Sequence, residues 1–533
     1  MPNREIRVAH VDDLQDGQMK KVTAGDRDVL LARIDGTYVA TGAECPHQGA
    51  SLEDGALHGD ECVCPWHHAR FELRNGGLVE PPSLDPLPRY KVRVSDGNVF
   101  VTVPEKESPA RRCSCEGFHP GSFDNRTFVV LGTGAAGGAA VEALRRNGFD
   151  GRIVLVSRDE QLPYDRTWLS KDYLAEGKSD GWIPYRSKRF YDTASIQLEL
   201  GRQVCHVDAV EHSIDFLAGP ALRYDQLLVA TGSEPIMLDV PGKDLKRIHT
   251  LRRLEDADAV IADAGAAGKA VVVGASFIGM EVAAALRKRD LEVTVVAPET
   301  VPFAAVFGED VGGLVRKVHE EQGVQFRLEE TVTAFEGSDA VENVKLESGD
   351  TLDADLVVVG IGVRPVTGML SGIGKNEDGS VNVDKGMRVV DGDGSLYAAG
   401  DIAAYPDPGT GQRRRIEHWR FAQQMGRVAA KTMVGQAPET FDKVPFFWTS
   451  QFDLELQHLG GTGSWDEAIL DGDLEEMEFL VYFVKDGAVV SVAGNWRDRD
   501  TGIIEECMRR RIMPDPDDLR GGGFDWEKLR HVE

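Results

Sequence analysis

Two cysteines and two histidines near the N-terminus form the most distinctive reactive group in the sequence. Cys45-Pro-His47 is followed, after sixteen residues, by Cys64-Pro-Trp-His67. One thiolate and one imidazole from each of two loops are the ligands of a [2Fe–2S] cluster with two cysteines on one iron and two histidines on the other. These residue types also bind structural zinc, but zinc sites usually pair cysteine with cysteine and histidine with histidine. The order found here favours the iron–sulfur cluster.

The chain around these four residues resembles a Rieske-type ferredoxin domain over nearly all of residues 1–104. The resemblance implies an all-β domain that holds a Rieske [2Fe–2S] cluster through the four residues. High-potential Rieske proteins carry an additional cysteine in each ligand loop, and here Ala50 and Ala69 stand near those places. The resemblance therefore indicates the ferredoxin-like branch of lower potential, although hydrogen bonds and solvent exposure also tune the potential.

Several other cysteines and histidines lie outside the ligand pattern. Cys62 is expected to be a small core residue, whereas His58 and His68 are expected at the surface. Cys113 and Cys115 form a C-x-C pair, and we expect two exposed thiols without a role there.

Two glycine-rich segments farther along the chain each lie between a buried strand and an alanine-rich helix. The first, Gly132-Thr-Gly134-Ala-Ala-Gly137, follows the strand Thr127-Phe-Val-Val-Leu. Glycines at this spacing allow a tight turn and a close approach of the backbone to a pyrophosphate, which the helix N-terminus attracts. An acidic residue after the next strand would bind the ribose, and Asp159 is the predicted one.

The second segment, Gly274-Ala-Ser276-Phe-Ile-Gly279, has serine in place of the central glycine, which modestly restricts the approach of the backbone. Ala297 stands where an acid normally binds the ribose 2′-hydroxyl. Glu299, twenty residues after Gly279, is predicted to take this role. No arginine follows this strand to receive a 2′-phosphate, so the second unit is predicted to bind NADH rather than NADPH.

Two such units in one chain resemble the FAD- and NAD-dependent pyridine-nucleotide oxidoreductases. The segments Leu228-Val-Ala-Thr231-Gly232 and Gly360-Ile-Gly-Val-Arg-Pro365 are similar to the strands that cross between the two units in that family. The segment Tyr397-Ala-Ala-Gly400-Asp401 resembles its second flavin motif. The resemblance implies that Asp401 bonds the ribityl chain of FAD.

The same resemblance implies where the flavin reacts. Leu162-Pro-Tyr-Asp-Arg166 and Leu169-Ser-Lys171 match the segment beside the isoalloxazine ring, with Lys171 near N5 and paired with Glu281 of the NAD unit. A lysine there offsets the negative charge that a hydride brings, and a buried lysine needs a carboxylate. An ordinary structural ion pair is the alternative interpretation of Lys171 and Glu281.

The cysteines and the C-terminal segment separate the branches of this family. Cys205 and Cys507 are single, so the flavin and NAD units lack the redox disulfide of a disulfide reductase. The segment Pro445-Phe-Phe-Trp448-Thr-Ser-Gln451-Phe, with Gly472-Asp-Leu-Glu-Glu later in the chain, resembles the third domain of the branch that passes electrons to iron–sulfur proteins. The resemblance implies that Trp448 approaches the flavin. Over residues 5–510 the chain resembles Rieske-fused ferredoxin reductases of the apoptosis-inducing-factor-like type. Residues 511–533 carry no such resemblance, and the last twenty residues are expected to be loosely structured.

The elements that must position these residues change in type along the chain. Short alternating strands come first, strand–helix–strand units typical of parallel sheets follow, and strands with a helix around 502–511 come last. The sequence predicts a multidomain protein with an N-terminal all-β Rieske domain, two α/β Rossmann-like domains for FAD and NAD, and a C-terminal α+β domain. The predicted ranges are 1–104 (Rieske), 105–125 (linker), 126–245 with 366–440 (FAD), 246–365 (NAD) and 441–533 (C-terminal).

Composition and charge limit the partners and the compartment. The chain has 60 Lys+Arg against 88 Asp+Glu, a net charge of −28, which opposes binding to nucleic acid or to an anionic membrane surface. The N-terminus lacks the apolar core of a signal peptide, and no apolar stretch is long enough for a membrane span. Seven cysteines are too few for a secreted disulfide scaffold. We therefore expect a cytoplasmic protein.

Together the motifs predict an NADH-dependent flavoprotein that passes electrons from NADH through FAD to the fused Rieske cluster and on to an unknown acceptor, such as a redox protein or an oxygenase. The linker is expected to set the effective concentration of the cluster near the flavin. Two alternatives stay open: the reductase component of a separate oxygenase, and a redox sensor that responds to NAD(H). A homodimer is a further expectation.

Overall fold

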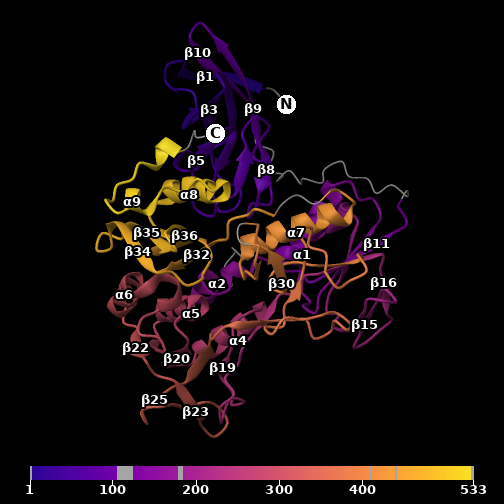
Figure 1. Ribbon diagram of the computed structural model, residues 1–533, viewed down its shortest axis with the longest axis vertical. Coiled ribbons are helices and arrows are strands. Elements are labelled where there is room, and N and C mark those ends of the chain that lie inside the picture. The colour runs from indigo at the N-terminus through magenta and orange to yellow at the C-terminus, as the bar shows by residue number, and fades with distance from the viewer. Residues whose placement is uncertain (1–2, 105–123, 178–183, 409–410, 438–440, 530–533) are drawn as a thin grey trace.

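The computed structural model describes residues 3–104, 124–177, 184–408, 411–437 and 441–529, which form four packed units (Figure 1). The N-terminal unit and the NAD unit lie at opposite ends of the long axis, with the flavin unit and the C-terminal unit between them. The predicted linker pair Cys113 and Cys115 lies outside the described residues. Among the described residues, no helix combines the length and the apolar character needed to cross a membrane.

The N-terminal unit consists of two antiparallel sheets, and the two ligand loops connect or extend their strands. Antiparallel pairs of the short strands that the sequence predicted build both sheets. The first ligand loop follows β4, and the second joins β6 to β7. The larger sheet has the order β1 (Asn3–His10), β10 (Asn98–Pro104), β9 (Arg89–Ser95), β4 (Thr37–Gly42), β3 (Arg27–Ile34), β2 (Gln18–Ala24). The smaller sheet has the order β5 (Ala56–His58), β6 (Glu61–Val63), β7 (Arg70–Glu72), β8 (Gly77–Glu80).

The flavin unit is built on a five-stranded parallel sheet whose short apolar strands are buried on both faces, as a sheet covered on both sides requires. The sheet order is β13 (Ile196–Glu199), β12 (Arg152–Val156), β11 (Thr127–Leu131), β17 (Gln226–Val229), β29 (Leu396–Ala398). Helix α1 (Ala135–Arg146) begins within the first glycine motif, with Gly134 as its N-cap, and packs against α7 (Trp419–Met433). The remaining elements are η2 (Arg166–Trp168), α2 (Asp172–Glu176), α3 (Lys188–Thr193), β14 (Val204–Asp208), β15 (Ser213–Phe216), β16 (Leu222–Arg223), β28 (Val381–Asn382), β30 (Ala403–Pro406) and β31 (Arg413–Arg414).

The NAD unit repeats this design. Its parallel sheet has the order β19 (Ile248–His249), β26 (Leu356–Val359), β20 (Lys269–Val273), β21 (Glu292–Ala297), β22 (Gln325–Leu328). Its other elements are α4 (Leu254–Ala264), α5 (Phe277–Lys288), α6 (Ala304–Glu321), β23 (Val332–Glu336), β24 (Asn343–Leu346) and β25 (Thr351–Asp353). The chain crosses between the two units through the antiparallel pair β18 (Ser233–Pro235) and β27 (Val363–Pro365), close to the crossing segments that the sequence predicted.

The C-terminal unit is a five-stranded antiparallel sheet with helix α8 (Asp498–Arg510) between it and the N-terminal unit. The sheet order is β32 (Phe446–Gln451), β33 (Leu454–Gly460), β36 (Ala488–Asn495), β35 (Glu478–Lys485), β34 (Glu467–Asp473). The prediction of a loosely structured tail is wrong for its described part, which forms α9 (Pro516–Leu519) and η3 (Trp526–Leu529). Trp526 is buried, and its indole nitrogen donates to the hydroxyl of Tyr482 at 3.0 Å, so the tail completes the core of this sheet.

The close contact of α1 and α7 depends on Gly426. A Cβ atom at this position would lie 2.1 Å from the carbonyl oxygen of Ala136. We therefore expect Gly426→Ala to push the two helices apart and to lower the free energy of unfolding by about 1–3 kcal/mol. Gly313→Ala is the control, because Gly313 also lies within a helix and has open space around it. Thermal unfolding of both variants measures the difference, and equal melting temperatures would contradict the packing argument.

Candidate functional site

The two ligand loops have the same backbone design. In each, the cysteine N–H donates to a carbonyl five residues later, from Cys45 to Ala50 and from Cys64 to Ala69, both at 2.8 Å. In each, the residue four after the cysteine donates back to the cysteine carbonyl and has a positive φ, +83° at Gly49 and +56° at His68. The loops thus present their side chains as two related halves of one site.

The predicted ligands meet in like pairs, cysteine with cysteine and histidine with histidine. The thiols of Cys45 and Cys64 are buried and share a hydrogen bond, which raises the pKa of Cys45. Nδ1 of His47 lies 3.1 Å from Nδ1 of His67, and burial lowers the pKa of His67, which keeps the ring neutral as metal ligation requires. Two thiols on one side and two imidazoles on the other suit a cluster with cysteine on one iron and histidine on the other.

His68 is not at the surface, contrary to the sequence prediction. Its side chain is fully buried, and Nδ1 lies 2.8 Å from a carboxylate oxygen of Glu505 in α8. The ring also stacks on Phe446 at a centroid distance of 4.0 Å. The prediction failed because the partners of His68 lie more than 370 residues away in the sequence, on a different domain. Cys62 is buried in the core, as predicted.

Glu505 connects three of the four units. Its second carboxylate oxygen accepts from Arg420 of α7 at 2.7 Å, and Arg420 also donates to the carbonyl of Pro81 at 3.0 Å. Beside it, Arg70 donates to Glu506 at 2.5 Å. Buried charges are tolerated only when they are paired and hydrogen-bonded, as these are, so the network specifies one docked position of the N-terminal domain.

A second polar contact lies at another place on the same interface. Arg186 of the flavin unit donates to Asp85 of the N-terminal domain at 2.6 Å and to Glu142 of α1 at 2.9 Å. Burial opposes the charge on Arg186, but the two carboxylates outweigh it and raise its pKa. The N-terminal domain is therefore held by ion pairs at two places on this interface.

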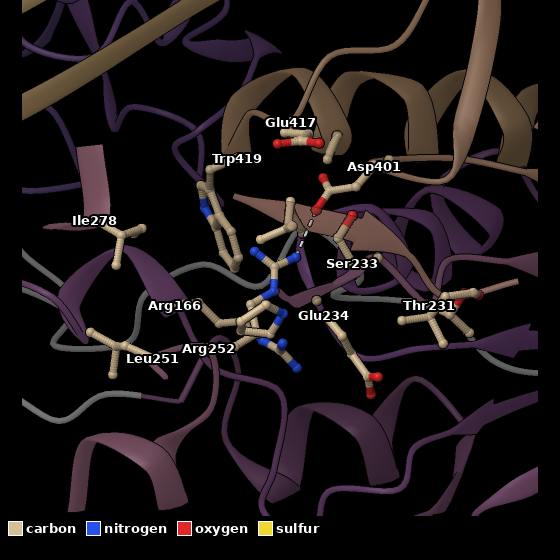
Figure 2. Close-up of a pocket in the computed structure, with 18 of the residues that line it drawn as sticks. Arg166, Thr231, Ser233, Glu234, Leu251, Arg252, Ile278, Asp401, Glu417 and Trp419 are labelled. Carbon is tan, nitrogen blue, oxygen red and sulfur yellow. Dashed lines mark hydrogen bonds and ion pairs between the residues drawn. The ribbon is translucent and has the colours of Figure 1, made fainter. Parts of the chain in front are cut away.

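A cleft of about 860 Å³ runs between the flavin and NAD units and is lined by both glycine motifs (Figure 2). A Cβ atom at Gly132 would meet the carbonyl of Ala230 at 2.1 Å, and one at Gly137 would meet the carbonyl of Gly132 at 1.9 Å. Gly134 faces open space, which leaves room for a pyrophosphate against the start of α1. In the second motif, Gly274 and Gly279 make the same two tight contacts with backbone carbonyl groups. Ser276 lies between them in the motif and is exposed, and exposed Glu299 also lines the cleft.

The acidic residues of the flavin unit lie along this cleft. Asp159 is buried; Oδ2 accepts from Arg166 at 2.9 Å, and Oδ1 has no hydrogen-bond partner among the described residues. Oδ1 lies 3.9 Å from the guanidinium of Arg253, and a buried carboxylate oxygen that still lacks a hydrogen bond suits a ribose hydroxyl. Asp401 accepts from Arg252 at 2.7 Å, a contact that Figure 2 shows and that the sequence did not indicate, because Arg252 belongs to no motif. Thr231, Gly232 and Gly400 line the same cleft.

Lys171 and Glu281 meet across the boundary of the two units. Nζ of Lys171 lies 2.9 Å from a carboxylate oxygen of Glu281, which is buried within α5. Thr449 of β32 donates to the same carboxylate at 2.6 Å, and Ser170 donates to its other oxygen. Residues from three units of the protein therefore fix the carboxylate of Glu281. This carboxylate in turn holds the ammonium group of Lys171 at the cleft.

Trp448 connects the cleft to the cluster ligands. Its side chain lines the cleft, and its ring lies 4.3 Å from the ring of His67, measured between centroids. Trp448 is carried by β32, next to Phe446, on which His68 stacks. The C-terminal sheet thus contacts the second ligand loop directly.

Comparison with known proteins agrees with this arrangement. Residues 126–426 match the pyridine nucleotide-disulphide oxidoreductase family, which is more than half of the chain. The chain belongs to this family. Residues 4–91 match the Rieske [2Fe-2S] domain, and residues 446–529 match the reductase C-terminal domain. The last match overturns the prediction that residues 511–533 resemble nothing known, because it extends to residue 529.

This oxidoreductase has relatives with and without the N-terminal domain. It is 37% identical to apoptosis-inducing factor 3 of Mus musculus over 95% of its own length and 84% of the relative. It is 32% identical to rhodocoxin reductase of Rhodococcus erythropolis over 75% of its length and 93% of the relative. Among solved structures, it matches the covalent putidaredoxin reductase–putidaredoxin complex with a TM-score of 0.71 and 28% identity, over 76% of this chain and 98% of that chain. The protein is an NADH-dependent flavoprotein oxidoreductase of the ferredoxin-reductase type with a fused Rieske domain.

Removing the charge of Glu505 should loosen the docked domain. Glu505→Gln leaves Arg420 buried without its carboxylate, and we expect the free energy of unfolding to fall by about 3–5 kcal/mol. Glu475→Gln is the control, because its pair with Lys317 is exposed and should contribute less than about 1 kcal/mol. Urea unfolding of both variants measures the difference. Similar losses in the two variants would show that the buried network does not hold the domains together.

Acid should weaken the same interface. Burial favours the neutral form of Glu506, but Arg509 and Arg70 outweigh it and lower its pKa from 4.5 to about 2. A carboxylate with a lowered pKa stabilises the fold fully above its unfolded value, and this contribution is lost as the pH falls from about 4.5 towards 2. We expect Glu506→Gln to lose less stability than the wild type across that range. Urea midpoints at several pH values test this, and parallel curves would refute it.

Proposed function

We propose that electrons from NADH reach the fused Rieske domain of this protein through Trp448. When bound, FAD accepts a hydride from NADH and the Rieske cluster accepts single electrons. The observation that supports this route is the 4.3 Å contact between the rings of Trp448 and His67, because Trp448 also lines the cofactor cleft. Its indole bridges the space where the flavin would lie and the second ligand loop.

We further propose roles for the predicted residues of the cleft. Lys171 offsets the negative charge that arrives with the hydride, and Glu281, oriented by Thr449 and Ser170, holds the ammonium group at that place. The flavin nucleotide would be held by Gly132, Gly134, Gly137, Asp159, Arg166, Thr231, Gly232, Gly400 and Asp401. The NADH nucleotide would be held by Gly274, Ser276, Gly279 and Glu299. Cys45, His47, Cys64 and His67 would hold the cluster.

In this proposal, the docked N-terminal domain is the first protein domain that accepts electrons from the flavin. A separate ferredoxin is therefore not needed for that step. Rhodocoxin reductase and the ferredoxin–NAD(+) reductase component of the Burkholderia cepacia anthranilate 1,2-dioxygenase system align over 93% and 96% of their own lengths but over only 75% and 74% of this chain. We propose that the fused domain takes the place of the ferredoxin and passes electrons to a further acceptor. None of the five cysteines in the described part of the chain forms a disulfide, which supports a reducing, cytoplasmic compartment.

Anaerobic rapid mixing of the holoprotein with NADH tests the route. Loss of flavin absorbance reports hydride transfer, and the electron-spin signal of the reduced cluster reports the second transfer. We expect Trp448→Leu to slow the second phase by about tenfold or more, because it removes the ring that bridges the gap, while Trp448→Phe retains most of the rate.

Two outcomes would contradict the proposal. Reduction of the cluster at the wild-type rate in Trp448→Leu would exclude the indole as the bridge. A cluster that stays oxidised in the wild type, with a long-lived complex of reduced flavin and NAD⁺, would favour the redox sensor over the electron-transfer enzyme.

A further inference from the structure

A second cavity, of about 360 Å³, lies where all four units meet. Its wall combines His67 from the second ligand loop, Lys171 from the flavin unit, Glu281 from α5 and Trp448 from β32. We call it the junction cavity. It is distinct from the cofactor cleft, although the last three of these residues border both spaces. Its size is within the range of cavities that bind small molecules.

Five large aromatic side chains contribute to the wall of the junction cavity, beside several charged groups. They are Trp66, Trp168, Trp448, Phe452 and Trp496. Two of these indoles are strongly exposed, Trp66 at 45% and Trp496 at 56%. Tryptophan faces of this kind pack against flat rings in stacked or edge-on geometry.

The backbone at Trp496 supports a binding role. Its φ of +54° is the left-handed conformation, which bulky side chains rarely adopt. An exposed indole on a strained backbone adds little to folding stability, and such strain is concentrated at functional sites. The conformation places a large apolar ring at the rim of the cavity, beside the start of α8.

Charged groups on the wall suit a molecule that gains electrons and protons. Lys171 and Lys288 supply positive charge for an oxygen atom that becomes negative on reduction. Asp498 lies on the same wall, and burial, followed by the nearby Glu455, raises its pKa to about 6. A carboxyl group with a pKa near neutrality is suited to donating a proton. Its side chain is held by Gln457, which donates to it at 2.6 Å.

The histidine ligands are otherwise covered by the docked domain. The side chain of His47 is 10% exposed and faces Asp165, while His67 is 8% exposed and packs on Trp448. A large protein surface therefore cannot lie flat on both imidazole rings in this arrangement. The junction cavity instead brings a space of small-molecule size to the ring of His67.

We propose that the junction cavity binds a flat quinone as the electron acceptor of this protein. The inference rests on the proposed function, which supplies the electrons. In the overall reaction, NADH and one proton from solvent convert the quinone to a hydroquinone and NAD⁺. The two electrons come from the C–H bond of NADH, and two O–H bonds form on the quinone. Asp498 delivers a proton from solvent, and the indoles of Trp66 and Trp496 hold the ring.

Calorimetric titration of the oxidised holoprotein with 1,4-naphthoquinone, without NADH, tests binding alone. We expect Trp496→Ala to weaken binding about three- to tenfold, as the loss of one aromatic stacking partner implies. Ser450→Phe, which fills the cavity from β32, should weaken it further. Leu470→Ala is the matched control, because Leu470 is an exposed apolar residue of the same sheet that does not line the cavity.

Turnover separates this inference from the proposed function. With NADH and 1,4-naphthoquinone, Trp496→Ala should raise KM for the quinone by the same factor, whereas Asp498→Asn should lower kcat with little change in KM. Equal affinity in the wild type, Trp496→Ala and Ser450→Phe would overturn the proposal and leave the exposed indoles to a protein partner. A cluster that NADH fails to reduce would refute the proposed function, and the calorimetric comparison would still decide whether the cavity binds the quinone.

Discussion

The buried carboxylate of Glu505 lies at the centre of the larger of the two polar contacts that hold the N-terminal domain against the rest of the molecule. It pairs with His68 of the second ligand loop and with Arg420 of the flavin unit while belonging to the C-terminal helix α8. Isolated, each of these charged or polar groups would be costly to bury. The three side chains satisfy one another's hydrogen bonds and charges only when the three units are docked as observed. The network therefore selects this docking, and the docking sets the position of the cluster ligands relative to the cofactor cleft.

The shared wall of the two cavities depends on that docking. Trp448 borders both the cofactor cleft and the junction cavity, and it contacts His67 only because the ligand loop lies against β32. Lys171 and Glu281 border both spaces as well. One ion pair and one indole therefore face both cavities. A charge that enters one cavity changes the electrostatic potential in the other, because the protein between them has a low dielectric constant.

Local sequence patterns were sufficient to predict much of the fold and of the candidate site. The order and spacing of Cys45, His47, Cys64 and His67 indicated paired thiol and imidazole ligands, and the structure brings these side chains together. The glycine motifs predicted strand–turn–helix units, because only glycine fits where a Cβ atom would meet a carbonyl oxygen. These features depend on neighbours in the sequence, and so they can be read from one segment at a time. Family resemblance added the partner Glu281 for Lys171, which spacing alone does not provide.

Contacts between distant segments were decided only by the tertiary structure. His68 was predicted at the surface because it lies outside the ligand pattern, and nothing near it in the sequence reveals Glu505 or Phe446. The tail was expected to be loose, yet Trp526 enters the core of the C-terminal sheet. The junction cavity is lined by residues of all four units, and no sequence motif predicts it. A chain records its local backbone preferences directly, whereas the burial of a charge or the shape of a cavity exists only once separate units have packed together.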